Sequence, residues 1–343
     1  DDHGDHNHGD HDHSHGSGLA GVLGRIFHTH GHSEQRLQRA ADPALDNATG
    51  IRTVWLALGA LGLTTVIQIV IVAISGSAAL LADTVHNLGD ALNSIPLLIA
   101  FYLARRTASR RYTYGFGKAE DVAGVVIVLS IVVSAGVTFW ESFQKLLNPT
   151  PILQPGWVAV AAIIGFLGNE AVALLQIRTG RQIGSAAMVA DGVHARTDGL
   201  TSLAVLPAVI GSWLGYPIVD ALVGLFIGIA IVFIARDAIT TVWYRLMDAI
   251  DPETVDRIEQ RAARVAGVQG VEHVRVRWVG HRLHTDLHIM VDEDLTTRES
   301  HAIAEAVRHD LLHDLDYLSV VNVHVDPCGH GGNDPHSITA HHI

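Results

Sequence analysis

The stretch Ala82–Asp90, ADTVHNLGD, returns at Ala190–Asp198 as ADGVHARTD, and both copies lie inside long apolar runs. Each copy reads Asp-x-x-His-x-x-x-Asp. Residues three, four and seven positions apart share one face of an α-helix, so each copy predicts a polar stripe on an apolar helix. Ionisable groups inside a membrane are costly unless a ligand or a partner compensates them. The repeat therefore predicts two membrane helices that share a divalent cation.

Apolar residues are concentrated between about positions 54 and 247 of this 343-residue chain. A helix needs roughly 20 mostly apolar residues to cross a bilayer. Six segments reach that length, so we expect an α-helical membrane protein with six transmembrane helices. The expected spans are residues 51–75, 79–103, 119–146, 155–178, 183–211 and 216–245.

Lys and Arg residues gather in the links after the second and fourth spans. They are Arg105, Arg106, Arg110, Arg111 and Lys118 in the first of these links and Arg178 and Arg181 in the second. By the positive-inside rule both termini lie in the cytoplasm. The formal net charge of −12 argues against a nucleic-acid partner and suits cations. The single cysteine, Cys328, excludes an intramolecular disulfide and suits a reducing compartment.

The composition divides the chain into four regions. Residues 1–50 are expected to form a disordered, His-rich cytoplasmic region that collects metal or is merely solvated. Residues 51–248 form the transmembrane domain, and residues 329–343 a disordered tail containing His. Between them, residues 249–328 show helical patterns at 252–265 and 296–313 and strand patterns at 271–280, 283–292 and 318–326. The order α-β-β-α-β predicts a cytoplasmic α+β domain of the ferredoxin-like or metallochaperone-like kind.

The two polar stripes can close one metal site. His86 and Asp90 face the same way on one helix, and His194 and Asp198 do so on the other, which gives the nitrogen and oxygen ligands of a tetrahedral zinc ion. Such ligands bind metal only when deprotonated, so zinc and protons can exchange at the same groups. The pattern therefore favours proton-coupled antiport, and no nucleotide-binding Walker motif is present.

Two further aspartates lie on the same helix faces one turn earlier. Asp83 and Asp191 are expected to support the histidines or to lie at the membrane boundary. Asn93 extends the first stripe, while Asn169 and Glu170 are polar groups in the fourth span that satisfy helix packing or line a water-filled path.

These features together resemble the cation diffusion facilitator family over about residues 51–328. The likeness includes YGFGKAE after the second span and LMD after the sixth. The combination of two His-Asp pairs is similar to the zinc-preferring, bacterial members. The resemblance implies a homodimer in the cell inner membrane that contacts lipid and exports cytoplasmic Zn²⁺ in exchange for protons by alternating access. It also implies that the chain is not an enzyme.

The resemblance also implies roles for residues outside the two stripes. Lys118 and Asp248 would form a charge interlock between protomers. A regulatory two-metal site at the dimer interface would use His273, His288, His301, His324 and Asp326. We expect His281, His309 and His313 to be surface residues, Cys328 to be incidental, and the loop SRRYTYGFGK to hold no metal.

Three alternatives remain open from the sequence. The exporter could carry mainly Cd²⁺, Co²⁺ or another divalent cation, because affinity orders are generic and selectivity lies in geometry. A membrane-anchored zinc sensor is a second alternative, although a mere anchor would not need two buried polar stripes. An intramembrane metalloenzyme is disfavoured because no HExxH motif is present.

Overall fold

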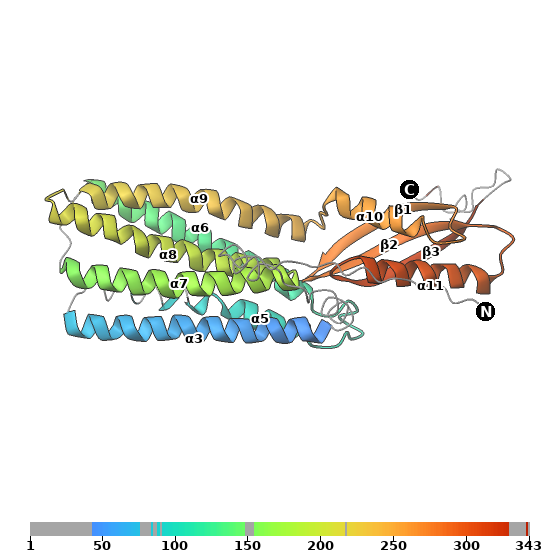
Figure 1. Cartoon of the computed structure of the whole chain (residues 1–343), viewed down its shortest axis with the longest axis horizontal. Coiled ribbons are helices and arrows are strands. Elements are labelled where there is room, and N and C mark those ends of the chain that lie inside the picture. Colours follow the sequence, from blue (N-terminus) through green and yellow to red (C-terminus); the bar gives the residue numbers. More distant parts are fainter. Residues whose placement is uncertain are drawn as a thin grey trace, which may run out of the picture. The chain divides into compact units, whose positions relative to one another are not determined.

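The computed structural model describes residues 43–75, 84, 88–89, 91–147, 154–216, 218–328 and 341. Helix α8 lies in the helical part of the molecule, in contact with α6, α7 and α9 (Figure 1). The helices of this part are α3 (Pro43–Ser75), α5 (Ile95–Ala104), α6 (Lys118–Leu147), α7 (Pro155–Ile183), α8 (Ala186–Trp213) and α9 (Ile218–Leu246).

Four of these helices are long and apolar enough to cross a membrane. They are the segments Asp46–Ile74, Lys118–Leu147, Pro155–Ile183 and Ile218–Leu246. Among the described residues, the prediction of six spans is thus supported for four. Helix α8, with 28 residues, is not one of these four and carries the polar stripe. Helix α5 has only 10 residues, and residues 79–83, 85–87 and 90 of the predicted second span lie outside the described part.

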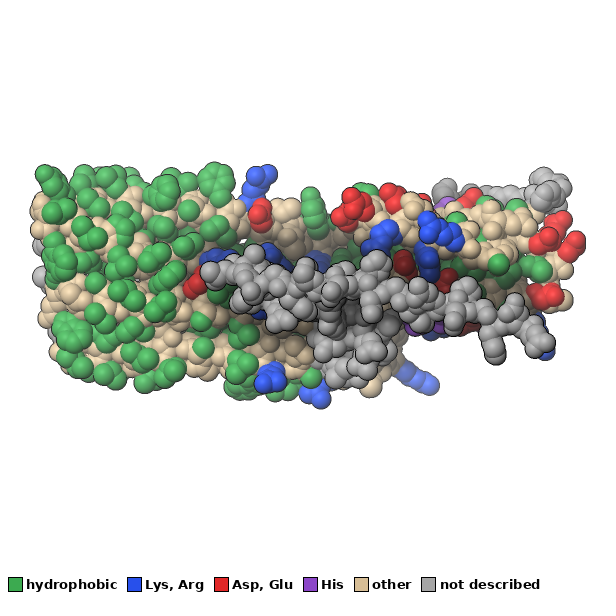
Figure 2. All heavy atoms as spheres, viewed as in Figure 1, with side chains coloured by type: hydrophobic (Ala, Val, Ile, Leu, Met, Phe, Trp, Pro, Cys, Tyr) green, Lys and Arg blue, Asp and Glu red, His purple; other side chains and the backbone are tan. Residues whose placement is uncertain are grey.

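Large apolar side chains cover the outside of the helices. Phe226 is 71% exposed and Val133 64% exposed, and Figure 2 shows hydrophobic side chains spread over this face of the helical part. On the same face, acidic and basic side chains gather toward the α+β domain. A surface this apolar suits the hydrocarbon of a bilayer rather than water.

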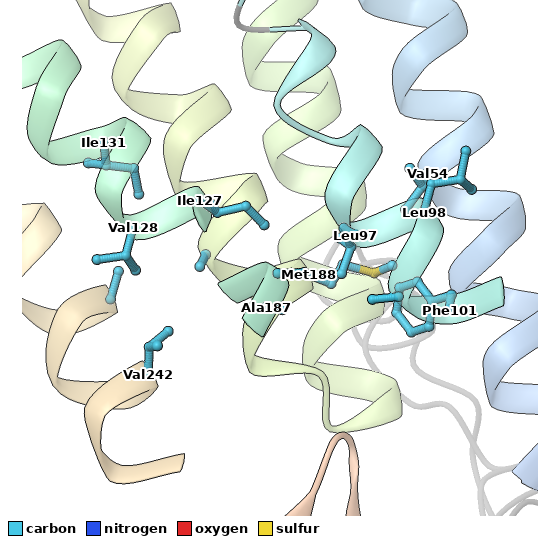
Figure 3. Packing of buried hydrophobic residues seen from close by; sticks show 14 of the residues in the cluster. Val54, Leu97, Leu98, Phe101, Ile127, Val128, Ile131, Ala187, Met188 and Val242 are labelled. Atoms are coloured by element: carbon cyan, nitrogen blue, oxygen red, sulfur yellow. The ribbon is translucent and has the colours of Figure 1, made fainter. Parts of the chain in front are cut away.

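A core of buried apolar side chains joins all six helices of the helical part. Val54 of α3, Phe101 of α5, Ile127 of α6, Met188 of α8 and Val242 of α9 belong to one cluster. Figure 3 shows these side chains between the ribbons, from Val242 at one side through Met188 to Phe101 and Val54 at the other. Since the cluster includes Met188 and Ala187, it fixes the first turn of α8, three residues before the polar stripe begins.

Helix α3 begins at Pro43, inside the region predicted to be disordered up to residue 50. The predicted boundary is too late because a contact from far along the chain orders this turn. Asp46 is 5% exposed and accepts a hydrogen bond from Arg282 at 2.6 Å. The rest of the predicted His-rich region, residues 1–42, and the predicted tail, apart from residue 341, lie outside the described residues.

The α+β domain has the predicted order of elements. Its elements are α10 (Pro252–Ala262), β1 (Gly270–Val279), β2 (Arg282–Val291), α11 (Thr297–Asp314) and β3 (Leu318–Pro327). Strand β2 is central, antiparallel to β1 and parallel to β3. Leu287 and Ile289 of β2 pack against Val307 and Leu311 of α11 in the core of the domain. Alternation along the strand therefore turns His288 to the opposite face of the sheet.

Candidate metal-binding sites

The polar stripe predicted for the fifth span lies on α8, and its three members are almost completely buried. Asp191, His194 and Asp198 are 3%, 2% and 8% exposed. Nε2 of His194 lies 3.7 Å from Oδ2 of Asp198, one turn later. Two ligands of one tetrahedral zinc ion lie about 3.4 Å apart when each bond is about 2.1 Å. The two side chains are therefore at a separation that one ion can span.

Side chains from two other segments contact this stripe. Ser94 Oγ donates to Oδ2 of Asp191 at 2.6 Å, and Gln176 Nε2 of α7 donates to the same oxygen at 2.5 Å. Asn93 Nδ2 donates to Nε2 of His194 at 2.9 Å. Two donors thus orient the Asp191 carboxylate, and a third contacts a ring nitrogen of the candidate ligand His194.

A cavity of about 10 Å³ lies between α8 and these side chains. That volume is close to what one water molecule requires. The buried Oε1 of Gln176 has no hydrogen-bond partner within the described part of the chain. The cavity is lined by Leu61, Ser94, Asn169, Gln176, Asp191, His194, Ala195 and Asp198. It therefore offers carboxylate, imidazole and amide groups to something as small as an ion or a water molecule.

The second span is interrupted where it contacts α8. Asn93 and Ser94 form a turn directly before α5, and Pro96 occupies the first turn of that helix. Proline lacks a backbone N–H, so Pro96 cannot donate a hydrogen bond to the turn before α5. The contacts of Ser94 and Gln176 with Asp191 were missed by sequence reasoning, although Pro96 in an apolar run was a signal for the break.

The predicted first stripe, with Asp83, His86 and Asp90, lies outside the described residues. The four-ligand site that joins His86 and Asp90 to α8 therefore stays a prediction. The described residues hold one half of that site, on α8, together with its neighbours from α7 and from the turn before α5.

A partly buried charge pair lies close to the stripe in sequence. Arg196 Nη2 donates to Oε1 of Glu170 at 2.8 Å, and its Nε donates to Oε2 at 3.1 Å. This two-pronged contact joins α8 to α7 and neutralises both charges within the helical part. Glu170 was predicted to satisfy helix packing or line a water path, but its partner Arg196 was not recognised.

In the α+β domain, three of the five predicted ligands converge on the face of the sheet away from α11. Nδ1 of His288 lies 2.9 Å from Oδ2 of Asp326, and Nε2 of His324 lies 3.1 Å from Oδ1 of the same carboxylate. One ligand atom from each residue lies within 4.8 Å of the other two. The register explains the grouping, because His288 pairs with His324 across β2 and β3 and Asp326 follows two positions later.

The other two predicted ligands, His273 and His301, lie outside this group of three. A bulge in β1 between Glu272 and Arg275 places His273 at a φ of 51°, and its ring centroid lies 5.1 Å from that of His288. His301 on α11 lies outside the group and lines a groove with Val323 and Val325, on the helix-covered side of the sheet. One chain therefore brings His273 to the edge of the group and does not bring His301 to it.

His284, on the same strand and face as His288, keeps a neutral ring at neutral pH. Partial burial, together with the Arg277 guanidinium, lowers the pKa of His284 below its usual 6.5. Arg277 is its neighbour across β1 and β2. The face that carries the candidate cluster thus gains no positive charge from His284.

Lys118 and Asp248, the predicted interlock, form an ion pair within a single chain. Lys118 Nζ lies 3.1 Å from Asp248 Oδ1 and 3.3 Å from Asp121 Oδ2. Both Lys118 and Asp248 side chains are 45% exposed. The contact joins the start of α6 to the chain just after α9, and any part it has between two protomers stays a prediction.

His281 was expected at the surface, but this prediction was wrong. The residue is 4% exposed, and its Nδ1 lies 2.7 Å from Oε2 of Glu120 on α6, which is 2% exposed. The turn between β1 and β2 inserts against the helical part, so the local pattern of a polar turn gave no sign of burial. Next to it, Arg282 pairs with Asp46 of α3 at 2.6 Å.

Arg245 near the end of α9 completes this contact between the helical part and the α+β domain. Its Nη1 donates to the backbone oxygen of Gly280 and its Nη2 to that of Gly184, each at 2.9 Å. The guanidinium carbon also lies 3.6 Å from the ring centroid of Trp278. We call Asp46, Glu120, Arg245, Gly280, His281 and Arg282 the junction.

The chain matches models of known protein families over both of its parts. Residues 54–247 match the cation efflux transmembrane domain, and residues 250–328 match the cytoplasmic domain of cation efflux proteins. A probable cation efflux system protein of Mycobacterium tuberculosis is 48% identical over 94% of this chain and 96% of its own length. The cation-efflux pump FieF of Serratia proteamaculans is 30% identical over 74% of this chain and 85% of its own. A cadmium form of the MamM cytoplasmic domain covers 23% of this chain and 96% of that chain, with 32% identity and a TM-score of 0.22.

Proposed function

Because this chain belongs to the cation efflux family of membrane transporters, we propose that it is a proton-coupled antiporter that exports Zn²⁺ from the cytoplasm by alternating access. The observation that supports this proposal most directly is the buried pair of His194 and Asp198, whose nearest nitrogen and oxygen lie 3.7 Å apart. Two ionisable groups buried in a membrane helix are costly without a cation or a proton between them.

In the proposed transport site, His194 and Asp198 bind zinc together with His86 and Asp90 of the second span. Asp191, one turn before His194, supports the site without binding the ion. Its hydrogen bonds with Ser94 and Gln176 favour this role. Asp83 takes the matching place on the other helix. A site of two imidazoles and two carboxylates satisfies four-coordinate zinc without any further ligand.

Proton exchange follows from the same ligand set. Imidazole and carboxylate groups release protons when they bind a metal and regain them when the metal leaves. A site that opens to alternate sides of the membrane then carries zinc one way and protons the other. The family is one of transporters rather than enzymes, so we assign no catalytic residue.

We propose a regulatory zinc site in the cytoplasmic domain, at the interface of a homodimer. His288, His324 and Asp326 form its centre, because their ligand atoms already lie within 4.8 Å of one another. His273 stands at the edge of this group. His301 lies across the sheet in its own chain, so its participation in a binuclear site requires a second protomer. Lys118 and Asp248 would join the two protomers near the membrane surface.

We place the protein in the bacterial cytoplasmic membrane with both termini in the cytoplasm. The named relatives from Mycobacterium tuberculosis and Serratia proteamaculans are bacterial, and the basic residues after the predicted second and fourth spans support the orientation. The runner-up cargo is Cd²⁺ or Co²⁺, since imidazole and carboxylate ligands accept these ions as well.

Zinc flux into sealed proteoliposomes tests the proposal. Vesicles loaded with a zinc-sensitive dye are compared with and without an imposed pH gradient, for the intact protein and for Asp198→Ala and Asp90→Ala. Thr201→Ala is the matched control, since its hydroxyl donates to the backbone oxygen of Thr197 on the same helix and contacts no proposed ligand side chain within the described residues. We expect gradient-driven entry in the intact protein and the control and its loss in both Asp variants. Gradient-independent zinc binding without entry, in folded protein, would exclude antiport and favour the sensor, and faster Cd²⁺ or Co²⁺ entry would reassign the cargo.

A further inference from the structure

The contact between Asn93 and His194 bears on how the proposed transport site opens and fills. The amide nitrogen of Asn93 lies 2.9 Å from Nε2 of His194. An amide nitrogen only donates hydrogen bonds, so Nε2 must accept and must carry its lone pair in this arrangement. Nε2 is also the ring nitrogen that lies 3.7 Å from Asp198.

A metal ion needs that same lone pair. Zinc binds imidazole nitrogen at about 2.0–2.1 Å along the direction of the lone pair, and an amide hydrogen at a normal hydrogen-bond distance occupies the same direction. The Asn93 contact and a metal bond at Nε2 therefore exclude each other. For zinc to bind there, the amide of Asn93 must move away.

Asn93 is placed to act in this way by the interruption of the second span. It lies in the turn before α5, and the next residue, Ser94, is held to Asp191 on the same face of α8. Side chains on a turn can move with less disturbance than those inside a regular helix, because fewer backbone hydrogen bonds restrain them. Ser94 thus anchors the turn while Asn93 reaches the ligand.

On the basis of the proposed transport site, we propose that Asn93 is a latch: its amide donates to the metal-binding nitrogen of His194 and must release that nitrogen when a divalent cation binds. Asn93 is therefore a positioning residue that sets how tightly the site binds its cargo. Removing it removes a competitor of the metal. A net hydrogen bond of ordinary strength corresponds to a change of about two- to tenfold in an equilibrium constant.

The test measures zinc binding to the purified full chain by competition with a fluorescent chelator. Asn93→Ala and Asn93→Leu both remove the donor, and the second keeps the branched shape of the side chain. Each Asn93 variant is compared with a double variant that also carries Asp198→Ala. The zinc binding that the second substitution abolishes, called the Asp198-dependent binding, is assigned to the transport site rather than to other metal sites. Thr201→Ala is again the control. Cobalt is the second probe, since its visible absorption reports the coordination of the ion.

We expect the Asp198-dependent zinc affinity to increase about two- to tenfold in both Asn93 variants and to stay unchanged in Thr201→Ala. In vesicles the KM for zinc falls while kcat does not rise. A merely structural role for Asn93 would weaken binding and raise KM, so unchanged or weaker affinity in both variants overturns the latch. A cobalt spectrum that loses a ligand in Asn93→Ala would also overturn it, because Asn93 would then be part of the coordination shell. If Asp198→Ala leaves binding to the intact chain unaltered, the transport site itself is refuted, and the latch with it.

Discussion

His281 and Glu120 lie 161 residues apart in the chain, yet Nδ1 of the one is 2.7 Å from Oε2 of the other, and both are almost fully buried. The centroid of the Phe101 ring, from α5, lies 6.1 Å from that of the His281 ring. A polar pair in such surroundings is costly to break, since removal of one partner leaves the other desolvated. The turn between β1 and β2 is therefore a structural anchor of the cytoplasmic domain on the helical part.

Replacement of His281 by Ala is expected to destabilise the protein by about 3–5 kcal/mol, because it leaves the Glu120 carboxylate buried without its partner. Thermal or denaturant unfolding in detergent measures the loss. His309→Ala is the control, since the His309 side chain is 70% exposed. The double variant Glu120→Ala/His281→Ala should lose less than the sum of the two single variants. Strict additivity would show that the two side chains do not interact.

Arg282→Met should loosen the first turns of α3. The change keeps the side-chain volume but leaves Asp46, which is 5% exposed, without the guanidinium that contacts it at 2.6 Å. We expect faster amide hydrogen exchange in residues 43–50 and little change in α11, measured by mass spectrometry. Equal exchange in both proteins would mean that α3 begins at Pro43 for reasons independent of this pair.

Asp326→Ala is expected to weaken metal binding at the cytoplasmic cluster by at least tenfold, because this carboxylate contacts both His288 and His324. Equilibrium dialysis of the full chain against zinc measures the number of bound ions. His313→Ala, on the exposed part of α11, is the matched control. The Asp198-dependent ion should remain in both variants. An unchanged stoichiometry in Asp326→Ala would refute the cluster as a zinc site.

The start of α11 predicts a dependence of stability on acid pH. Glu299 accepts hydrogen bonds from the side chain and the backbone of Thr296, at 2.7 and 2.8 Å, and these lower the pKa of Glu299 below its ordinary 4.5. The unfolded chain then binds the proton more readily than the folded one. The cap therefore stabilises the domain above about pH 4.5, and this contribution is lost as the pH falls through the lower folded pKa. Unfolding of Glu299→Gln should show a shallower acid limb, whereas identical acid limbs would refute the effect.

The local pattern of apolar and polar residues was sufficient to predict the elements of the α+β domain and the polar stripe on α8. Two-residue alternation predicted β2 and β3, and their shared register then brought His288 and His324 together. The spacing of three and four residues placed Asp191, His194 and Asp198 on one helix face. These features depend on neighbours in sequence or on adjacent strands, which periodicity reports directly.

Features that depend on distant contacts were not predictable in the same way. The burial of His281 requires Glu120 from another domain, and the early start of α3 requires Arg282. The positive φ of His273 arises from a bulge in β1, and no Gly or Pro in that part of the strand indicated a bulge in the sequence. His301 looked equivalent to the other histidines in sequence, but the packing of α11 on the sheet places it on the opposite side.

Strand β2 begins at the junction and runs on to the candidate cluster of His288, His324 and Asp326. Arg282, its first residue, touches α3, and His288 lies six residues further along the same strand. At about 3.3 Å per residue this distance is about 20 Å of continuous hydrogen-bonded backbone. One continuous strand therefore carries both a contact with the membrane helices, at Arg282, and a candidate metal ligand, at His288.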